Sequence, residues 1–581
     1  MLVICLKSKK DKYMKSKKIK GLLYKVVVLL IFLVIFYLVI RYTIEDNTYY
    51  EANNDEEYYL PVIETTDIHG YIIDISSNDE ATYKYRLGYI ANKINEEKSK
   101  GDILLLDTGD FYQGNILSNN LDGQPIRAYI DKMEYDAVGL GNHEFDWGLS
   151  TVLDHDGTVG SYDLSSDIKA DSKVPVLCWN LYDSETKEKI DYTKDYIIVN
   201  KEAKSKNGQT KKINIAVFGF INDYSSSVAK DKIKGYEIKE DDFIAIDKMA
   251  KELESSKKAD ATVIVCHASP DEMTAFIKDD TVIDLVLCGH DHKASEGTFS
   301  NGVPYIDGGA YGASYATADI VITNDNQVTV LNRQINYIND NELKLYDNAQ
   351  NDAYLDDAIM DLSHASLDLV NEKCADFTSK LGYIVTDISR DKLEGSVGED
   401  IASNWAATMY AKAMDAQVGV INSTGVRCGF LMGDDEEKHY LTGADIYTMF
   451  PFKNRLFVYE ITYEQLLDLC SKVALNDHSY LGLSGVDIYY EDEDRKKPVE
   501  LYLDGKMIYE NEWKVDKSTK VRVAVADFIA AFDNLCFIDL TPINESEYVV
   551  DSEKVIEFLK NNYGPDKEIE VDTKIHLKKL P

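Results

Sequence analysis

The residues most suited to chemistry are histidines, aspartates and one asparagine that directly follow short apolar runs. Five of the ten histidines in the chain lie in these loops. Imidazole nitrogen combined with carboxylate oxygen suits Zn, Mn, Fe or Ni better than Ca, which prefers oxygen ligands alone. The candidate ligands are Asp67 and His69 in TTDIHG, Asp110 in LLLDTGD, Asn142 in GLGNHE, His267 in VIVCHAS, and His290 and His292 in LCGHDH. The sequence therefore predicts a metal site assembled from several loops.

Two of these motifs share one spacing, because His290 and His292 are separated by one residue, as Asp67 and His69 are. At an extended strand end, residues i and i+2 point the same way, so both side chains are expected to reach one ion. With Asp110 as a bridging carboxylate, the set supplies ligands for two ions, which can clamp the oxygens of a phosphorus centre. One such motif alone is weak, since strand-end His and Asp also serve as capping or solvated loop residues. The ordered set favours metal binding.

Strands must position these loops. Six apolar runs are predicted as buried strands that end in polar loops, namely LPVIET, DILLLDTGD, AVGLGNHE, NIAVFGFI, ATVIVCHAS and DLVLCGHD. Residues 85–98 and 242–257 show helical spacing between them. Alternating strands and helices predict an α/β layered domain, in which ligands bind beyond the carboxyl ends of the strands. A polar helical segment follows, and then a second α/β or α+β unit.

In order and type, the loop motifs D-x-H, G-D, G-N-H-E, H and G-H-x-H resemble those of the calcineurin-like metallophosphoesterases. GNHEFDWG and GDFYQG resemble the 5′-nucleotidase branch, which includes UDP-sugar hydrolases and 2′,3′-cyclic-nucleotide phosphodiesterases. The likeness covers residues 58–545. It implies a four-layer αββα metallophosphoesterase domain over 58–336, a linker helix over 337–380 and a C-terminal α/β (α+β) substrate-binding domain over 381–581.

This resemblance also implies roles for the loop residues. One divalent ion (Zn, Mn or similar) would take Asp67, His69, Asp110 and His292, and a second would take Asp110, Asn142, His267 and His290. His143 would contact the phosphate in the transition state, and Asp146 would orient it and keep it protonated if a helical turn begins there. Asp146 could instead be an acid that favours a helix N-terminus. The expected reaction is attack of a metal-bound hydroxide on phosphorus, with no phosphoenzyme.

The C-terminal unit carries motifs that resemble a nucleoside pocket. NSTGVR (422–427) resembles N-x-G-G-I-R, PFKN (451–454) resembles P-F-G-N, and VADFIAAF resembles the N-D-F-L-A block. The resemblance assigns Phe452 and Phe528 as aromatic walls around a base, with Asn422, Arg427 and Asn454 as polar contacts. Both phenylalanines could instead be core aromatics, and Arg427 could form a surface ion pair.

The pocket also departs from the family pattern. Relatives continue with G-G-D-G-[YF], whose Asp binds the ribose, but Phe528 is followed here by IAAFDNLCF and Asn534 stands where that Asp is expected. Residues 395–404 contain no Lys or Arg, although relatives often place a basic residue there on the substrate phosphates. We therefore expect a complete metal site beside an altered specificity pocket.

The formal net charge of −38 combines two opposite parts. Residues 1–41 carry nine Lys, Arg41 and a single acid, Asp11, whereas the remaining 540 residues carry a net −47. Residues 26–40, VVVLLIFLVIFYLVI, are uncharged and predict a transmembrane signal anchor over 21–41 behind a basic cytoplasmic tail over 1–20. A cleaved signal peptide followed by secretion is the alternative. A signal anchor and a cleaved signal peptide would both export the acidic part of the chain. A net charge of this size disfavours a nucleic-acid polymer as partner.

These observations predict an extracytoplasmic, membrane-anchored phosphohydrolase that uses two divalent ions to remove phosphate from nucleotides. The alternatives are a 2′,3′-cyclic-nucleotide 2′-phosphodiesterase/3′-nucleotidase, a broad phosphomonoesterase, and a surface binding module that retains the fold without turnover. The sequence predicts no oligomeric state.

Overall fold

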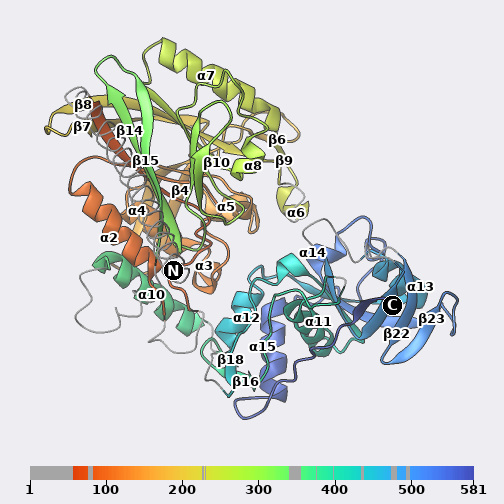
Figure 1. The fold of residues 1–581 in the computed structure, drawn as a ribbon. Coiled ribbons are helices and arrows are strands. Elements are labelled where there is room, and N and C mark those ends of the chain that lie inside the picture. The colour runs from red at the N-terminus through yellow and green to blue at the C-terminus, as the bar shows by residue number, and fades with distance from the viewer. Residues whose placement is uncertain are drawn as a thin grey trace, which may run out of the picture.

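The computed structural model describes residues 57–75, 83–224, 228, 230–338, 355–373, 376–396, 398–432, 437–472, 480–491 and 497–580. The predicted basic tail and signal anchor, residues 1–41, lie outside these ranges. Among the residues inside them, no helix combines the length and apolar character that a membrane crossing requires. The chain forms two bodies, one coloured red to green and the other cyan to blue in Figure 1.

The N-terminal body contains a large mixed sheet. Its strands follow the order β12-β13-β11-β10-β8-β7-β1-β2-β3-β5-β4, and β14 pairs with both β1 and β15. The bounds are β1 Glu57–Thr65, β2 Leu104–Asp107, β3 Ala137–Gly139, β4 Thr158–Asp163, β5 Lys169–Leu177, β7 Tyr196–Lys204, β8 Thr210–Ile221, β10 Ala261–His267, β11 Leu285–Cys288, β12 Ser295–Thr298, β13 Pro304–Asp307, β14 Ser314–Thr323 and β15 Val328–Tyr337. A separate pair is formed by β6 (Leu181–Asp183) and β9 (Tyr236–Ile238). All six predicted runs are strands.

Parallel pairing explains why the polar loops converge. β1 pairs in parallel with β2, and β2 with β3, while β8, β10, β11 and β13 form a second parallel series. The carboxyl ends of parallel strands meet at one edge, so the loops after β1, β2, β3, β10 and β11 gather there.

Side chains alternate between two cores along each strand, as the period of two requires. On β2, Leu104 and Leu106 point into a core shared by the strands, whereas Leu105 packs with the helices on the outer side. On β10, Val263 and Val265 enter the same strand-only core, and Ile264 faces the other helical layer. The layers therefore run helix, strand, strand, helix.

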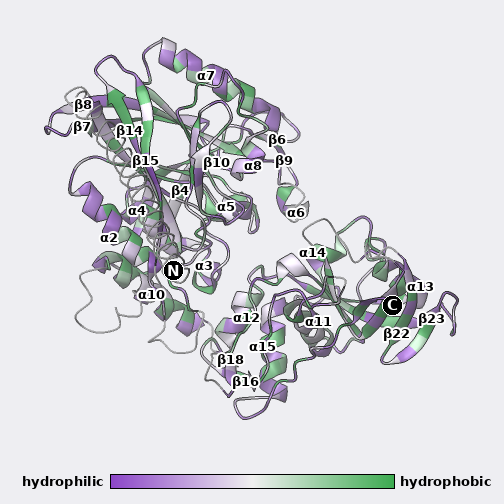
Figure 2. Cartoon of the chain, viewed as in Figure 1, coloured by the Kyte–Doolittle hydropathy of each residue, from purple (hydrophilic) through white to green (hydrophobic). Residues whose placement is uncertain are grey.

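Amphipathic helices cover the two outer faces. One layer contains α2 (Arg86–Lys98), α3 (Ile116–Asn120), α4 (Gln124–Lys132) and α10 (Asp357–Lys373), and the other contains α7 (Phe243–Ser255) and α8 (Pro270–Met273). The short elements η2 (His143–Phe145), α5 (Leu149–Val152), α6 (Lys230–Ile233) and η3 (Glu240–Asp242) lie in connections. Figure 2 shows hydrophilic and hydrophobic residues alternating along α7, as expected for a helix with one buried face.

The C-terminal body has two small sheets, β19-β24-β17-β20 and β23-β22-β21-β25, and the pair β16-β18. Its strands are β16 Lys380–Ile384, β17 Val418–Asn422, β18 His439–Thr442, β19 Leu456–Thr462, β20 Leu481–Ser484, β21 Val486–Tyr490, β22 Pro498–Leu503, β23 Lys506–Glu510, β24 Lys520–Ala526 and β25 Leu577–Lys579. Its helices are α11 Ile401–Ala413, α12 Gly443–Met449, α13 Tyr463–Cys470, α14 Asp527–Ala530 and α15 Asp551–Asn562, with the single turn η5 at Ser423–Gly425. In Figure 1, α3 and α10 lie on the side of the first body that faces α12, and α12 contacts α3.

Candidate metal centre

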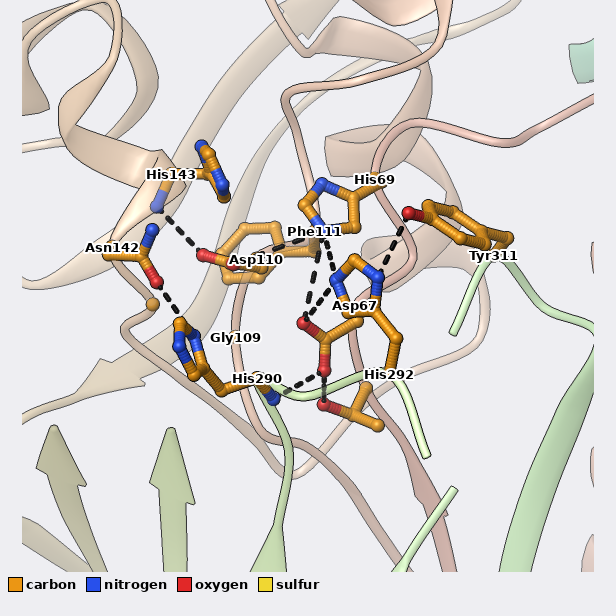
Figure 3. A network of polar contacts seen from close by, with 12 residues as sticks. Asp67, His69, Gly109, Asp110, Phe111, Asn142, His143, His290, His292 and Tyr311 are labelled. Carbon is orange, nitrogen blue, oxygen red and sulfur yellow. Dashed lines mark hydrogen bonds and ion pairs between the residues drawn. The ribbon is translucent and has the colours of Figure 1, made fainter. Parts of the chain in front are cut away.

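The seven predicted ligands come together at the carboxyl end of the parallel strands, and Figure 3 labels all of them except His267. Six of them form two groups among the described residues, and the donor atoms within each group all lie within 4.8 Å of one another. The first group is Asp67, His69 and His292, and the second is Asp110, His267 and His290.

Asp110 belongs to the second group and also faces the first. One of its oxygens, Oδ2, is 3.1 Å from His267 Nε2 and 3.9 Å from His69 Nε2. Asn142 completes the second group, because its Oδ1 is 3.1 Å from both His267 Nε2 and His290 Nδ1. This geometry suits a carboxylate that bridges two ions.

The local conformation of the ligands differs from the sequence-based expectation. β1 ends at Thr65 and β11 at Cys288, so neither Asp-x-His nor His-x-His lies on an extended strand end. Instead, five ligands have left-handed backbones: Asp67 (φ 48°), His69 (φ 49°), Asp110 (φ 55°), His290 (φ 82°) and His292 (φ 61°). The prediction that each pair would lie at alternate positions of an extended strand end was therefore wrong. It was also wrong in pairing His290 with His292, since they join different groups.

Left-handed conformations cost non-glycine residues about 1–3 kcal/mol each, so surrounding contacts must hold them. Asp67 N donates to Gly109 O at 3.0 Å, and His69 N donates to Asp110 O at 2.9 Å. The loops after β1 and β2 are thereby joined by main-chain hydrogen bonds. Strained backbones that are held in this way are typical of functional sites.

The donor atoms fit divalent ions. Asp67 is fully buried, and its Oδ1 faces two imidazole nitrogens, His292 Nε2 at 3.4 Å and His69 Nε2 at 3.8 Å. In three of the histidines, Nδ1 is within hydrogen-bond distance of an oxygen atom. The contacts are His69 Nδ1 to Gln113 O (2.6 Å), His267 Nδ1 to Thr108 O (3.1 Å) and His292 Nδ1 to the Tyr311 hydroxyl (2.9 Å). The two carbonyl oxygens fix a proton on Nδ1 of His69 and His267, so their Nε2 atoms face the centre, whereas the Tyr311 hydroxyl orients the His292 ring as either donor or acceptor.

The surroundings of Asp67 and His69 favour the protonation states that bind metal. Burial raises the pKa of Asp67, but the hydrogen bond and charge of neighbouring histidines outweigh burial and hold it at about 2. Burial places the pKa of His69 well below its ordinary value, so this imidazole is neutral. An ionised carboxylate and a neutral imidazole are the forms that bind metal.

Metal affinity should rise with pH, because a third ligand binds a proton in competition. Burial lowers the pKa of His267, but the Asp110 carboxylate outweighs burial and raises it to about 10. The proton is therefore bound below that pH and must be displaced by an incoming ion. We expect affinity for Mn or Zn to increase between pH ~6 and ~9, with proton release on binding. Calorimetry in buffers of different ionisation enthalpy measures both quantities, and a pH-independent affinity without proton release would contradict this prediction.

His143 lies beside the two groups without joining either. It begins the single turn η2, so Asp146 falls on the same face, and His143 Nδ1 is 2.7 Å from Asp146 Oδ2. Burial lowers the pKa of His143, but the charges of Asp146 and Asp110 outweigh burial and raise it. The imidazole is therefore oriented and biased towards its protonated form.

Residues of the C-terminal body reach this centre. The ring centroid of Phe452 is 5.9 Å from that of His143, and the Arg427 guanidinium carbon is 5.7 Å from the Phe452 centroid. The other predicted pocket residues make contacts within their own body. Asn422 Nδ2 donates to Thr424 Oγ1 (2.9 Å), Asn454 hydrogen-bonds Asp551, Phe528 packs against Phe532 (centroids 5.4 Å) and Asn534 is exposed.

Sequence reasoning missed two supporting residues, Glu144 and Tyr311. Glu144 is fully buried and accepts hydrogen bonds from Asp110 N (2.9 Å), Phe111 N (3.0 Å) and Gly141 N (2.8 Å). Its presence in GNHE was the available signal, since a glutamate beside two site residues needs an explanation. Tyr311 carried no such signal, because its contact with His292 joins separate loops.

Glu144→Ala should destabilise the N-terminal body by about 3–5 kcal/mol, because three buried N–H groups would lose their acceptor. Glu144→Gln retains one carbonyl oxygen and should cost less. Urea unfolding followed by tryptophan fluorescence measures the difference. Equal stability of the alanine variant and the wild type would show that the three hydrogen bonds contribute little.

Comparison with known proteins places the site in a class. Residues 60–294 match the family described as calcineurin-like phosphoesterase, and residues 377–537 match the 5′-nucleotidase C-terminal domain. The fold and the two ligand groups thus define a two-domain metallophosphoesterase. Residues 60–294 thus form a calcineurin-like phosphoesterase domain and residues 377–537 a 5′-nucleotidase C-terminal domain, which confirms the predicted resemblance, the enzyme class and the α/β fold.

Two relatives with similar sequences have names that refer to nucleotide substrates. A 2′,3′-cyclic-nucleotide 2′-phosphodiesterase/3′-nucleotidase of Haemophilus influenzae is 26% identical over 266 residues, which are 42% of this chain and 38% of that protein. A 5′-nucleotidase of Vibrio parahaemolyticus is 23% identical over 486 residues, covering 76% of this chain and 80% of that protein. The matched region thus spans less than half of the first relative and most of the second.

Among solved structures, a 5′-nucleotidase precursor from Thermus thermophilus has the same fold. It superposes with a TM-score of 0.65 at 16% identity, over 90% of this chain and 99% of that one. The agreement extends across both bodies.

Proposed function

We propose that this protein is an extracytoplasmic phosphohydrolase that uses two divalent ions to hydrolyse nucleotide phosphoesters in the manner of a 5′-nucleotidase. The observation that carries the proposal is the convergence of seven donor residues in two groups about Asp110, with His143 and Arg427 beside them. Bound divalent ions would supply Lewis acidity and activate water at neutral pH. The names of the relatives favour nucleotides as the substrate class.

The protein's own residues have complementary tasks in this proposal. The ligands would hold the ions, and His143, with Nδ1–H held by Asp146, would present Nε2–H to the phosphate as negative charge develops. Arg427 would neutralise a phosphate oxygen, and Phe452 would offer a face on which a base can stack.

A substrate panel tests the proposal. Purified protein that lacks residues 1–42, supplied with Mn or Zn, should release inorganic phosphate from AMP. A 2′,3′-cyclic nucleotide, a 3′-nucleotide and an aryl phosphate form the other arms. Preference for the 2′,3′-cyclic nucleotide and the 3′-nucleotide would select the cyclic phosphodiesterase/3′-nucleotidase alternative, which the name of the Haemophilus relative supports. Equal turnover of all phosphomonoesters would indicate a broad phosphomonoesterase. Two bound metals without turnover of any substrate would leave only the binding-module alternative.

The proposal includes a single-pass anchor at residues 21–41 that holds the catalytic body outside the cytoplasm. The basic flank and uncharged core of that segment support it. Full-length protein should sediment with membranes and resist alkaline carbonate extraction, and external protease should digest the catalytic body in intact cells. Release of the protein into the medium would instead support a cleaved signal peptide.

A further inference from the structure

Asn119, at the end of α3, makes two hydrogen bonds that join the bodies beside the metal centre. The Asn119 amide donates through Nδ2 to Pro451 O at 2.7 Å. Lys453 Nζ donates to Asn119 O at 2.6 Å. Pro451 and Lys453 flank Phe452, so one residue of the N-terminal body holds both sides of the segment that carries this ring.

Asn119 is itself tied to the ligand loops. It is only 3% exposed, and its Oδ1 accepts from Gly114 N at 3.0 Å. Gly114 lies against His69 so closely that an added Cβ would be 2.7 Å from His69 O. The next residue, Asn115, donates its N–H to His69 O at 2.7 Å. The contact between the bodies is therefore continuous with the backbone of a metal ligand.

Lys453 adopts a conformation that its residue type disfavours. Its φ is +53°, in the left-handed region where glycine is preferred, and the P-F-G-N pattern that this segment resembles has glycine at this position. Its side chain also loses freedom when the ammonium group is held. A charge-assisted hydrogen bond to Asn119 O offsets these costs and gives a physical reason for lysine here.

These contacts affect the position of Phe452 and Arg427 relative to the metal centre. Phe452 is half-buried between His143 and Arg427, at 5.9 Å from the His143 ring and 5.7 Å from the Arg427 guanidinium carbon. Domains of one chain move relative to one another by default unless their interface is large and hydrophobic. Contacts that restrict this movement therefore set how often Phe452 faces the metal centre.

We propose that Lys453 and Asn119 form an interdomain latch that positions Phe452 at the metal centre and thereby tightens binding of substrates that carry a base. Both are positioning residues in this proposal, which rests on the proposed nucleotide hydrolysis for its substrate. The latch itself is a property of the protein without substrate and can be measured separately.

The test compares Lys453→Gly with Lys453→Met in full-length protein. Glycine relieves the left-handed backbone and methionine keeps much of the side-chain stem, but both remove the ammonium group. We expect each to raise KM for AMP about tenfold, equivalent to ~1.4 kcal/mol, with a smaller change for an aryl phosphate. Lys453→Arg should restore most of the affinity because it retains a charged donor.

A matched control is available at Lys257, which follows α7 and also has a left-handed backbone, with φ +58°. Its side chain is exposed. Lys257→Gly therefore makes the same chemical change and gives the same backbone relief away from the interface. It should leave KM for AMP unchanged.

A second readout separates failure of the latch from failure of the proposed function. Spin labels on exposed positions of the two bodies report their distance distribution by pulsed dipolar spectroscopy without any substrate. Both Lys453 variants should broaden that distribution, whereas Lys257→Gly should not. Wild-type distributions in both Lys453 variants would overturn the latch whatever the substrate is. If distributions broaden but AMP is not hydrolysed by the wild type, the latch stands and the proposed function fails.

Discussion

Replacing His143 by alanine is expected to lower kcat by about 10²- to 10³-fold while leaving metal content unchanged. His143 is outside both ligand groups but lies beside them, with its ring centroid 5.3 Å from that of His69. Asp146 holds its Nδ1 at 2.7 Å and helps to raise its pKa above the ordinary value. The variant would lose a protonated donor and no ligand. Steady-state kinetics and elemental analysis of the same preparation measure the two effects.

The pH dependence gives this prediction a second readout. Because the pKa of His143 is raised, its protonated form is present below that pKa and is lost as pH rises through it. Asp146→Asn removes the main charge that raises the pKa, so the alkaline fall of kcat should move to lower pH. His155→Ala is a matched control, since His155 also pairs with an aspartate, Asp191 at 2.8 Å, but is exposed. Loss of metal from His143→Ala would make His143 a ligand and sink the assigned role.

Replacing Asp110 by asparagine is expected to remove both metals and essentially all activity. Its carboxylate faces His267 and His69, one from each group, and its other oxygen accepts from His143 N at 2.7 Å. Asparagine has similar size but lacks the negative charge that two adjacent cations require. Mutation of residues that only hydrogen-bond to ligands weakens metal binding by about 10–100-fold. The loss of metal affinity on removing a shared ligand should therefore be larger than about 100-fold.

Titration calorimetry of the metal-free variant measures both sites. Asp284→Asn provides the control, because Asp284 is a carboxylate immediately before β11 that accepts from Thr262 N at 2.7 Å and belongs to neither ligand group. It should keep both ions. If Asp110→Asn still binds two ions with wild-type affinity, Asp110 does not bridge them.

Local patterns were sufficient for the framework of the N-terminal body. Apolar runs such as DILLLDTGD and ATVIVCHAS bury both faces, so their strands were predictable without tertiary information. Polar residues after parallel strands meet at one edge, which is why the order of motifs led to the ligand set. The i, i+3 relation of His143 and Asp146 was equally local.

The conformation of the ligand loops is imposed by contacts from outside each segment and was not predictable from local sequence. Asp67 and His69 were expected on an extended strand end but have left-handed backbones, because hydrogen bonds to the loop after β2 hold them there. No local preference of Asp or His specifies that geometry. The motif was recognisable although its conformation was not.

By itself, the sequence determined which residues have ligand chemistry, which strands carry them and which domain families they resemble. Only the tertiary structure decided that Phe452 and Arg427 approach His143 while Phe528 packs against Phe532. It also decided that Lys453 reaches Asn119 across 334 residues of sequence. The physical reason is that strand and turn preferences act between neighbours, whereas contacts between bodies depend on how two separately packed cores meet.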